Sequence, residues 1–310
     1  MIRTKLFFIF FILTFIFQND TQSKEIKILF KIESEIITTI DVENEYKYLI
    51  ALNKNIKNLS RKEIINISKK SIIKEKIQKI EISKKFKDPK IPNEYLEQIL
   101  KSIYVKIGIK NLTDFKEYLK NNNVDYTNVK NKIETEALWN ELIFAKFSSK
   151  IKIDEKKIRN EFLKNGKKFF KSYLMSEIFF EIQNANDFKK VFDSIKKTIK
   201  DKGFGNAALT HSTSNTSNVG GKLGWIKEDS LNKKLKNILS NMDKNDFTNP
   251  ITVPGGFLIL KIDEIKKIEK NQNINEEIKK IINTKKNNQL NQFSKMYFNK
   301  IKKDIFINEL

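Results

Sequence analysis

The chain has 310 residues, enough for two domains, and it contains no cysteine. The lack of cysteine excludes disulfides, a thiolate nucleophile and a cysteine-ligated zinc site. Lysine and arginine outnumber aspartate and glutamate by 60 to 38, which gives a net charge of +22. Such an excess could serve nucleic acid or an anionic membrane. The lysines are spread along every segment, however, and joint enrichment of lysine, isoleucine and asparagine is what an AT-rich coding sequence produces.

The first 23 residues have the layout of a secretory signal peptide. Arg3 and Lys5 form a positive start, and a stretch of twelve mostly apolar residues follows. Thr21-Gln22-Ser23 then provides a small-x-small site, so cleavage is predicted before Lys24. The apolar stretch is short for a membrane span of about 20 residues. An uncleaved membrane anchor is the alternative.

A mostly helical region is predicted from residue 24 to 167. It opens with a β-hairpin that turns at Glu33-Ser34-Glu35, and Thr38 begins the helix that follows. Ser60 starts a capping box, and isoleucines at helical spacing predict one long amphipathic helix to about Phe86. Asn93 is predicted to cap the next helix, and further helices are predicted to begin at Thr113, Asp125 and Asp154.

Trp139 and several phenylalanines lie at helical spacing within this region. Aromatic side chains could grip a bound peptide. At this spacing, however, they more often belong to the core. We therefore predict that Trp139 is a core residue.

A separate α+β region is predicted from residue 168 to 266. A β-rich stretch leads into a helix whose apolar residues share one face, and Gly203 ends that helix. A second short helix begins at Phe204. Three glycines then fall within five residues, which indicates a specified turn because glycine adopts positive φ without steric cost. A short helix with Leu231 and Leu235 and an apolar strand complete the region.

After Asp263 the chain is predicted to return to helix. Apolar residues from Ile274 to Ile301 give one long amphipathic helix, and residues 304–310 have the pattern of a strand. An apolar stripe of this length would lie exposed if nothing covered it. The segment 267–310 therefore needs a partner surface elsewhere in the chain.

The middle region contains a set of spaced residues, which are Phe204, Ser212, Gly220-Gly221-x-Leu223-Gly224-Trp225, Pro250-Ile251, Gly256-Phe257 and Lys261-Ile262. Their order resembles a parvulin domain, the peptidyl-prolyl isomerase fold. The hairpin and first helix resemble the opening of SurA-type periplasmic chaperones. That resemblance implies that the C-terminal helix and strand rejoin the N-terminal helices. The predicted fold class is α+β, a mostly helical SurA-like module with one small inserted parvulin domain.

The resemblance also implies a proline-binding site in which several residues are replaced. Parvulins carry a histidine on the first strand, a cysteine or aspartate after the first helix pair, and a histidine on the last strand. These positions align with Glu177, Ser214 and Leu258. The catalytic candidates are Glu177, Ser214 and Thr252. The substrate-binding candidates, which keep the pocket apolar, are Leu231, Leu235, Phe257 and Leu258.

Two polar residues near this site can each be interpreted as part of the site or as a residue without a functional role. Glu177 could be a displaced polar group of the site, but an exposed strand carboxylate is the preferred interpretation. His211, the only histidine, could be a pH-sensitive donor beside the pocket, but a helix-end residue is preferred. The sequence contains no metal-binding cluster, no nucleophile–base pair and no phosphate-binding glycine loop. No cofactor or metal is predicted.

The resemblance implies a periplasmic chaperone whose partners are unfolded polypeptides, outer-membrane proteins among them. Because most polar positions of the parvulin site are replaced, isomerase activity is predicted to be weak or lost. The alternatives are an active parvulin-type isomerase, a membrane-anchored foldase and a secreted basic nucleic-acid binder. No nucleic acid or small-molecule partner is predicted in the preferred interpretation.

Overall fold

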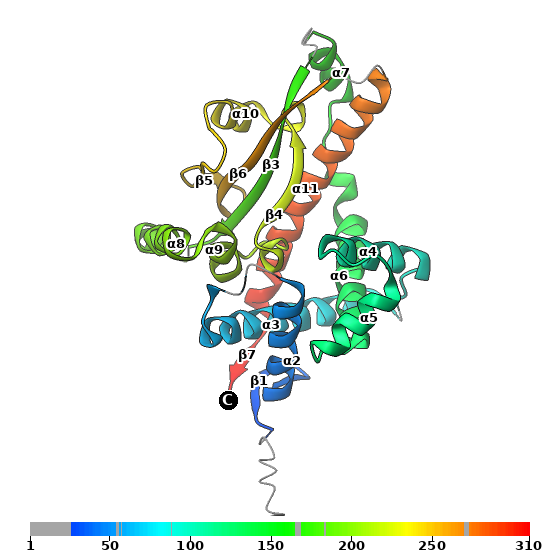
Figure 1. Ribbon diagram of the computed structural model, residues 1–310, viewed down its shortest axis with the longest axis vertical. Coiled ribbons are helices and arrows are strands. Elements are labelled where there is room, and N and C mark those ends of the chain that lie inside the picture. The colour runs from blue at the N-terminus through cyan, green and yellow to red at the C-terminus, as the bar shows by residue number, and fades with distance from the viewer. Residues whose placement is uncertain are drawn as a thin grey trace, which may run out of the picture.

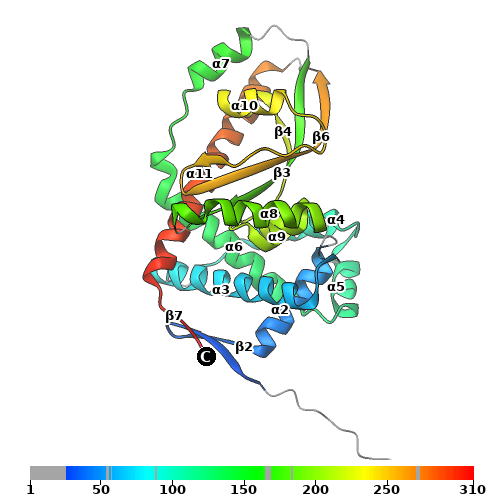
Figure 2. The same ribbon diagram turned by 90° about the vertical axis from the view of Figure 1, so that its left-hand side faces the viewer.

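The computed structural model describes residues 26–53, 56, 58–87, 89–164, 169–182, 184–269 and 273–310. The predicted signal peptide, residues 1–23, lies outside this set. None of the described helices combines the length and the apolar character that a membrane crossing requires. The elements form two bodies stacked along the long axis of the molecule, and the C-terminal helix α11 (Ile274–Asp304) runs beside both (Figure 1 and Figure 2).

The first body, which we call the helical module, joins the N-terminal half of the chain to its C-terminal end. Its strands are β1 (Ile28–Ile32), β2 (Glu35–Thr38) and β7 (Ile307–Glu309). Besides α11, its helices are α2 (Thr39–Leu52), α3 (Arg61–Lys85), α4 (Asn93–Lys106), α5 (Leu112–Asn121), α6 (Tyr126–Phe147) and α7 (Glu155–Lys164).

Side-chain caps set where several of these helices begin. Thr38 and Ser60 each accept a hydrogen bond from a backbone N–H three residues on, and the acidic residue there bonds back to the cap, as predicted. Asp125 caps α6, also as predicted. Asn93, predicted as a cap, is instead the first residue of α4. Pro92 takes the cap position and makes no side-chain hydrogen bond there, because proline has no polar side chain.

The last strand of the chain completes the sheet that the first strand opens. The strand order is β2-β1-β7, and β7 pairs antiparallel with β1. The backbone N–H of Leu310 donates to the carbonyl of Leu29 at 3.0 Å. In Figure 1 the blue β1 and the red β7 lie at the same end of the molecule. The C-terminal helix and strand thus pack on the N-terminal elements.

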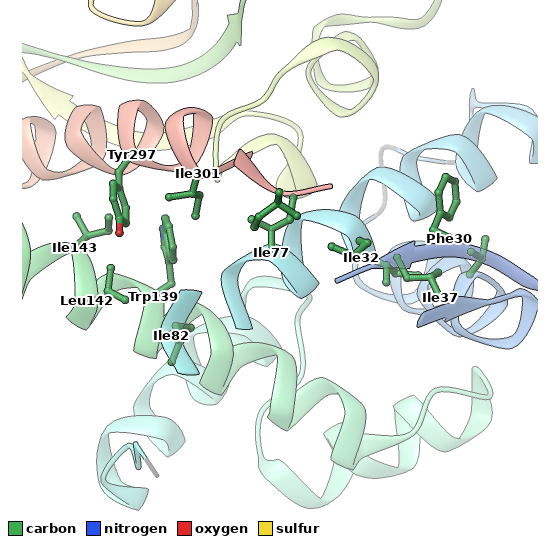
Figure 3. Packing of buried hydrophobic residues seen from close by; sticks show 13 residues of the cluster. Phe30, Ile32, Ile37, Ile77, Ile82, Trp139, Leu142, Ile143, Tyr297 and Ile301 are labelled. Atoms are coloured by element: carbon green, nitrogen blue, oxygen red, sulfur yellow. The ribbon is translucent and has the colours of Figure 1, made fainter. Parts of the chain in front are cut away.

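The core of the helical module is shared by α3, α6, α11 and the small sheet. Trp139 on α6 is almost fully buried and stacks on Tyr297 of α11 with ring centroids 5.9 Å apart. Its indole N–H donates to the hydroxyl of Ser294 at 2.8 Å. Figure 3 shows Trp139, Tyr297 and Ile301 close together between the two helices. Trp139 is a core residue, as predicted, and the peptide-gripping alternative is wrong for it.

The second body, which we call the inserted domain, runs from residue 169 to 269. Its strands are β3 (Phe169–Phe180), β4 (Lys222–Lys227), β5 (Ile251–Val253) and β6 (Gly256–Glu269). They form an antiparallel sheet in the order β4-β3-β6-β5. The main helices of the domain are α8 (Phe188–Lys202), α9 (Phe204–His211) and α10 (Lys233–Ser240).

Alternation of side chains along the strands gives this sheet two differently covered faces. α8 and α9 cover one face, where Ile178, Phe180 and Ile259 are buried. α10 covers part of the opposite face, over Met175 and Leu260. Because α10 has only two turns, much of that face remains open toward α11.

Strand β6 is longer than predicted, and the helix expected directly after Asp263 begins later. The sequence there is rich in lysine and glutamate and was expected to lead into a helix, whereas the strand continues to Glu269. A ladder with β3 holds it, from Phe257 opposite Phe180 to Glu269 opposite Phe169. The hydrogen bonds come from a strand far earlier in the chain, so no local pattern signals them.

A buried ion cluster ties α2, α3 and α6 together. The Lys132 ammonium lies 2.9 Å from a carboxylate oxygen of Glu45 and 3.1 Å from one of Glu75. Lys132 and Glu45 are almost entirely buried. Burial alone would lower the pKa of Lys132, but the two carboxylates outweigh it and hold that pKa above its usual value. The cation therefore stays charged in the core and pairs with both carboxylates, while Lys79 supplies a second positive charge to Glu75.

Lys132→Met is expected to lower the free energy of unfolding by about 3–5 kcal/mol, because it leaves the buried Glu45 carboxylate without a counter-charge. Lys79→Met is the matched control. Lys79 pairs with the same Glu75, at 2.6 Å, but on the surface, where the loss should be about 1 kcal/mol or less. Urea titrations followed by circular dichroism measure both. Equal losses would mean that the buried cluster contributes no more than a surface pair.

Candidate functional site

A cavity of about 1030 Å³ lies between the open face of the inserted domain and α11. The sheet and α10 form an apolar floor, made of Met175, Leu223, Leu231, Leu235, Leu258 and Leu260. α7 and α11 form the opposite wall, which includes Phe162, Ile281 and Lys295. The walls of one cavity thus come from segments that are far apart in the sequence.

Of the predicted site residues, the structure places Glu177, Leu231, Leu235 and Leu258 along this cavity. Phe257 lies elsewhere. Side chains alternate along β6, so Phe257 points to the opposite face from Leu258 and joins the cluster under α8 and α9. Its ring centroid lies 5.4 Å from that of Phe180 and 4.9 Å from that of Phe188. This position corrects the expectation that Phe257 lines the proline pocket.

Thr252 and Ser214, predicted as catalytic candidates, do not line the cavity. Thr252 is exposed on the edge strand β5, opposite Phe257 in the register. Ser214 is completely buried. Any influence of Ser214 on the cavity must therefore pass through the residues that it bonds to.

Ser214 belongs to a row of hydroxyl groups that ends at Glu177. The Thr216 hydroxyl donates to a carboxylate oxygen of Glu177 at 2.9 Å, and Ser214 Oγ lies 2.7 Å from Thr216 Oγ1. Ser212 Oγ lies 3.0 Å from Ser214 Oγ. Because Thr216 has one hydroxyl proton and gives it to Glu177, Ser214 must donate to Thr216 and Ser212 to Ser214. The hydroxyl protons of the row therefore all point toward the carboxylate.

Glu177 is buried, so the expectation of an exposed strand carboxylate is wrong. Its second partner is Lys295 of α11, whose ammonium lies 3.3 Å from both carboxylate oxygens. The same ammonium lies 4.6 Å from the centre of the Phe179 ring. The buried carboxylate is tolerated because the helical module supplies a counter-charge.

Lys295 and Thr216 are the polar site residues that reasoning from the sequence missed. Lys295 lies 118 positions after Glu177, on a helix of the other body, so no local motif links the two. Thr216 carried a usable signal. It lies two residues after Ser214, in a run of small hydroxyl and amide side chains before the glycine turn, and such side chains often bond to nearby backbone and to each other in turns.

The helical module also holds the segment 212–218, which carries this row of hydroxyls. The Lys74 ammonium donates to the side-chain carbonyl of Asn215 at 2.7 Å. The side-chain amide of Asn53 donates to the backbone carbonyl of Asn218 at 2.8 Å. The position of the loop thus depends on α3 and on the end of α2.

The turn after this loop requires a glycine at Gly221. Its φ is +76°, and its carbonyl accepts a hydrogen bond from the backbone N–H of Glu177 at 2.7 Å. A Cβ atom at this position would lie 2.1 Å from the carbonyl oxygen of Glu177. No side chain fits so close to β3, so the glycine sets the distance between the loop and the strand.

His211 lies in the last turn of α9 and does not line the cavity. Its Nε2 lies 2.9 Å from the Thr198 hydroxyl oxygen on α8. Burial, and then the nearby Lys70 ammonium, lower its pKa to about 4. The helix-end interpretation agrees with this position, whereas a donor beside the pocket does not.

The chemistry available in the cavity is limited to a few groups. In the part of the chain that the structure describes, no group of three or more histidine, aspartate or glutamate side chains is arranged to hold a metal ion. The floor offers apolar contacts, and the Glu177–Lys295 pair offers a fixed charge pair at its edge. Such a site can take up an apolar side chain and orient the polar backbone next to it.

Comparison with known proteins adds sequence relationships to this geometry. Residues 177–264 match the family described as the PPIC-type PPIase domain, or rotamase. Chaperone SurA of Pseudomonas putida is 26% identical over 184 residues, which are 56% of this chain and 43% of that protein. Chaperone SurA of Pseudomonas aeruginosa is 22% identical over 187 residues, with 56% and 44% covered. The chain resembles SurA and carries one parvulin-type domain.

The match to the rotamase family begins within β3 and ends within β6, so the inserted domain is this parvulin-type domain. The predicted α+β class is confirmed. The matched stretch spans less than half the length of the two SurA relatives. Among solved structures, a SurA-like chaperone of Campylobacter jejuni aligns over 91% of this chain and 98% of its own at 18% identity, with a TM-score of 0.31.

Gly221→Ala is expected to destabilise the parvulin-type domain by about 2–4 kcal/mol, because the added Cβ would collide with the backbone of β3. Gly224→Ala is the matched control. Gly224 has a similar φ of +82°, but no atom lies within 4 Å of the added Cβ, so only backbone strain of about 1–2 kcal/mol remains. Denaturant unfolding measures both. Equal losses would show that the close approach itself is unimportant.

His211 should make the protein less stable as the pH falls from about 6.5 to about 4. Its folded pKa lies below its unfolded value, so the unfolded chain binds the proton first and stability is lost across this window. His211→Gln keeps a polar side chain that cannot titrate. The variant should therefore lose less stability than the wild type between neutral pH and about pH 4.5, by about 1–3 kcal/mol. Parallel pH profiles of the melting temperature would contradict this.

Proposed function

We propose that this protein is a chaperone that holds unfolded polypeptides, with a parvulin-type domain whose isomerase activity is weak or lost. The observation that carries the proposal is the large cavity with an apolar floor between the parvulin-type domain and α11. Beside this floor, the positions that supply polar groups in parvulins hold other residues. The resemblance to SurA supports the chaperone class.

The floor of the cavity suits reversible holding. Burying one leucine-sized side chain contributes about 1.5–3 kcal/mol. The floor presents leucine and methionine side chains from β3, β4, β6 and α10. Hydrophobic contacts are non-directional, so they require no fixed sequence in the ligand. Clients of many sequences can therefore bind and leave.

The same site is poorly equipped for isomerisation. Rotation about an Xaa–Pro bond faces a barrier of about 20 kcal/mol, and lowering it needs polar groups that favour the twisted amide. Leu258 offers no hydrogen bond, Ser214 is buried away from the cavity, and Glu177 is already bonded to Thr216 and Lys295. A group of this kind can contribute about 3 kcal/mol, so the loss of several leaves little acceleration.

We further propose that the protein acts in the periplasm on unfolded outer-membrane proteins. Export is supported by the signal-like pattern of residues 1–23. The client class rests on the resemblance to SurA. Strands of membrane β-barrels alternate apolar and polar side chains, and a cavity with an apolar floor and charged groups at its edge can accept both.

The domain organisation belongs to the same proposal. Residues 24–167 and 267–310 would form one chaperone module, into which the parvulin-type domain of residues 168–266 is inserted. The pairing of β7 with β1 supports this, as does the shared core of α6 and α11.

A second candidate function is an active parvulin-type isomerase with a rebuilt site. One observation favours it. Lys295 lines the same cavity as Leu231 and Leu258, so its ammonium could serve as a donor in place of a histidine. A membrane-anchored form of this foldase would require that residues 1–23 are retained.

Leu235→Asp should distinguish the two functions. Leu235 is only partly buried, so a charged side chain there should weaken apolar binding to the cavity floor and have a limited effect on folding. The wild-type chain of residues 24–310 should suppress aggregation of an unfolded β-barrel protein and barely accelerate an Xaa-Pro peptide assay. The variant should bind clients about tenfold more weakly. Leu163→Asp, at an exposed leucine of α7 outside the cavity, is the control.

A fast, saturable isomerase rate that Leu235→Asp abolishes, without suppression of aggregation, would make the protein an isomerase first. If Leu235→Asp and Leu163→Asp both hold clients as well as the wild type, client binding takes place outside the cavity.

A further inference from the structure

The rim of the cavity presents cations that the fold does not neutralise. Lys157 on α7, Lys233 on α10 and Lys285 on α11 line the cavity from different sides. Within the described ranges, no carboxylate oxygen lies within 4.0 Å of any of these ammonium groups. Each of them is therefore available to a ligand.

The acidic residues of the cavity are mostly bonded already. Glu177 is held by Lys295, and Asp229 lies 3.4 Å from the Lys236 ammonium. Glu161 and Asp154 are the exceptions, since neither forms an ion pair within the described residues, although Asp154 accepts a hydrogen bond from the backbone N–H of Lys157. The charge left free around the cavity is therefore mainly positive.

Lys285 is the most informative of the free cations. It is partly buried in the α11 wall, and burial lowers its pKa although the carboxylates of Glu161 and Asp229 act in the opposite direction. The nearby Lys157 lowers this pKa further. A partly buried ammonium that lacks a paired carboxylate is destabilised by desolvation. A carboxylate that enters with a ligand would remove this penalty.

We propose that the cavity selects client segments in which an aspartate or glutamate lies within a few residues of a bulky apolar side chain. The apolar side chain packs on the floor around Leu235 and Leu258, and the carboxylate binds among Lys285, Lys157 and Lys233. This inference rests on the proposed function, because it names the class of peptide that the same cavity holds.

The overall charge of +22 would attract acidic peptides to any part of the surface. At physiological ionic strength such long-range attraction is screened beyond about 8 Å. A preference that depends on the cavity lysines, and not on lysines elsewhere, therefore distinguishes a binding site from general attraction.

The test uses fluorescent peptides that share the same leucine and phenylalanine residues and differ in carrying a pair of glutamates, glutamines or lysines. Fluorescence anisotropy with the chain of residues 24–310 should show that the glutamate peptide binds about tenfold more tightly than the glutamine peptide. The lysine peptide should bind most weakly. The double variant Lys157→Gln and Lys285→Gln should lose this preference while still binding the glutamine peptide.

The matched control is Lys189→Gln and Lys190→Gln, which removes the same charge from α8, outside the cavity. It should keep the preference. Equal loss in both double variants, or no preference in the wild type, would overturn the inference and leave the proposed function intact, because all the peptides still bind. If no peptide binds, both the inference and the proposed function fail.

Discussion

The packing of α11 against two bodies at once is the interaction on which the rest of the structure depends. Toward the helical module, Tyr297 enters the core beside Trp139, and the chain beyond the helix pairs with β1. Toward the parvulin-type domain, Lys295 pairs with Glu177. Burial of large aromatic side chains contributes several kcal/mol, whereas a buried ion pair adds little net stability, because the desolvation of both charges offsets their attraction. α11 is therefore held more strongly by the helical module than by the parvulin-type domain. The parvulin-type domain docks onto the face of α11 that the helical module leaves open.

That docking is largely polar, which sets how the cavity can respond to its surroundings. Leu209 of α9 makes an apolar contact with side chains of α2 and α3. Other interactions between the two bodies are hydrogen bonds and ion pairs. Lys202 of α8 bonds to Glu63 of α3, and this bond is the main reason why the pKa of Glu63 is lowered to about 2. Polar contacts weaken with salt more than apolar ones do. The contact between the two bodies is therefore expected to weaken as the salt concentration rises.

The sequence predicted what is local and missed what is made between distant segments. Helix capping at Thr38 and Ser60 depends on residues three positions apart, so the spacing of residue types was sufficient to predict it. The apolar floor residue Leu231 was predicted from its residue type. The burial of Glu177 was missed because strand alternation shows which face a side chain occupies but not which helix covers it. The partner Lys295 and the long β6 ladder were missed for the same reason, because the residues that stabilise them lie more than 75 positions away in the sequence.

Under the proposed function, the Glu177–Lys295 pair would make this cavity better suited to hold a chain than to twist it. A histidine in this place can share its proton with a substrate, whereas this carboxylate already accepts from Thr216 and Lys295. Drawing Lys295 toward a twisted amide would leave Glu177 buried without its counter-charge, which is costly. Packing an apolar side chain on Leu235 and Leu258 disturbs none of these bonds. On this proposal, binding energy in the site would stabilise the ground state of a client and not its transition state.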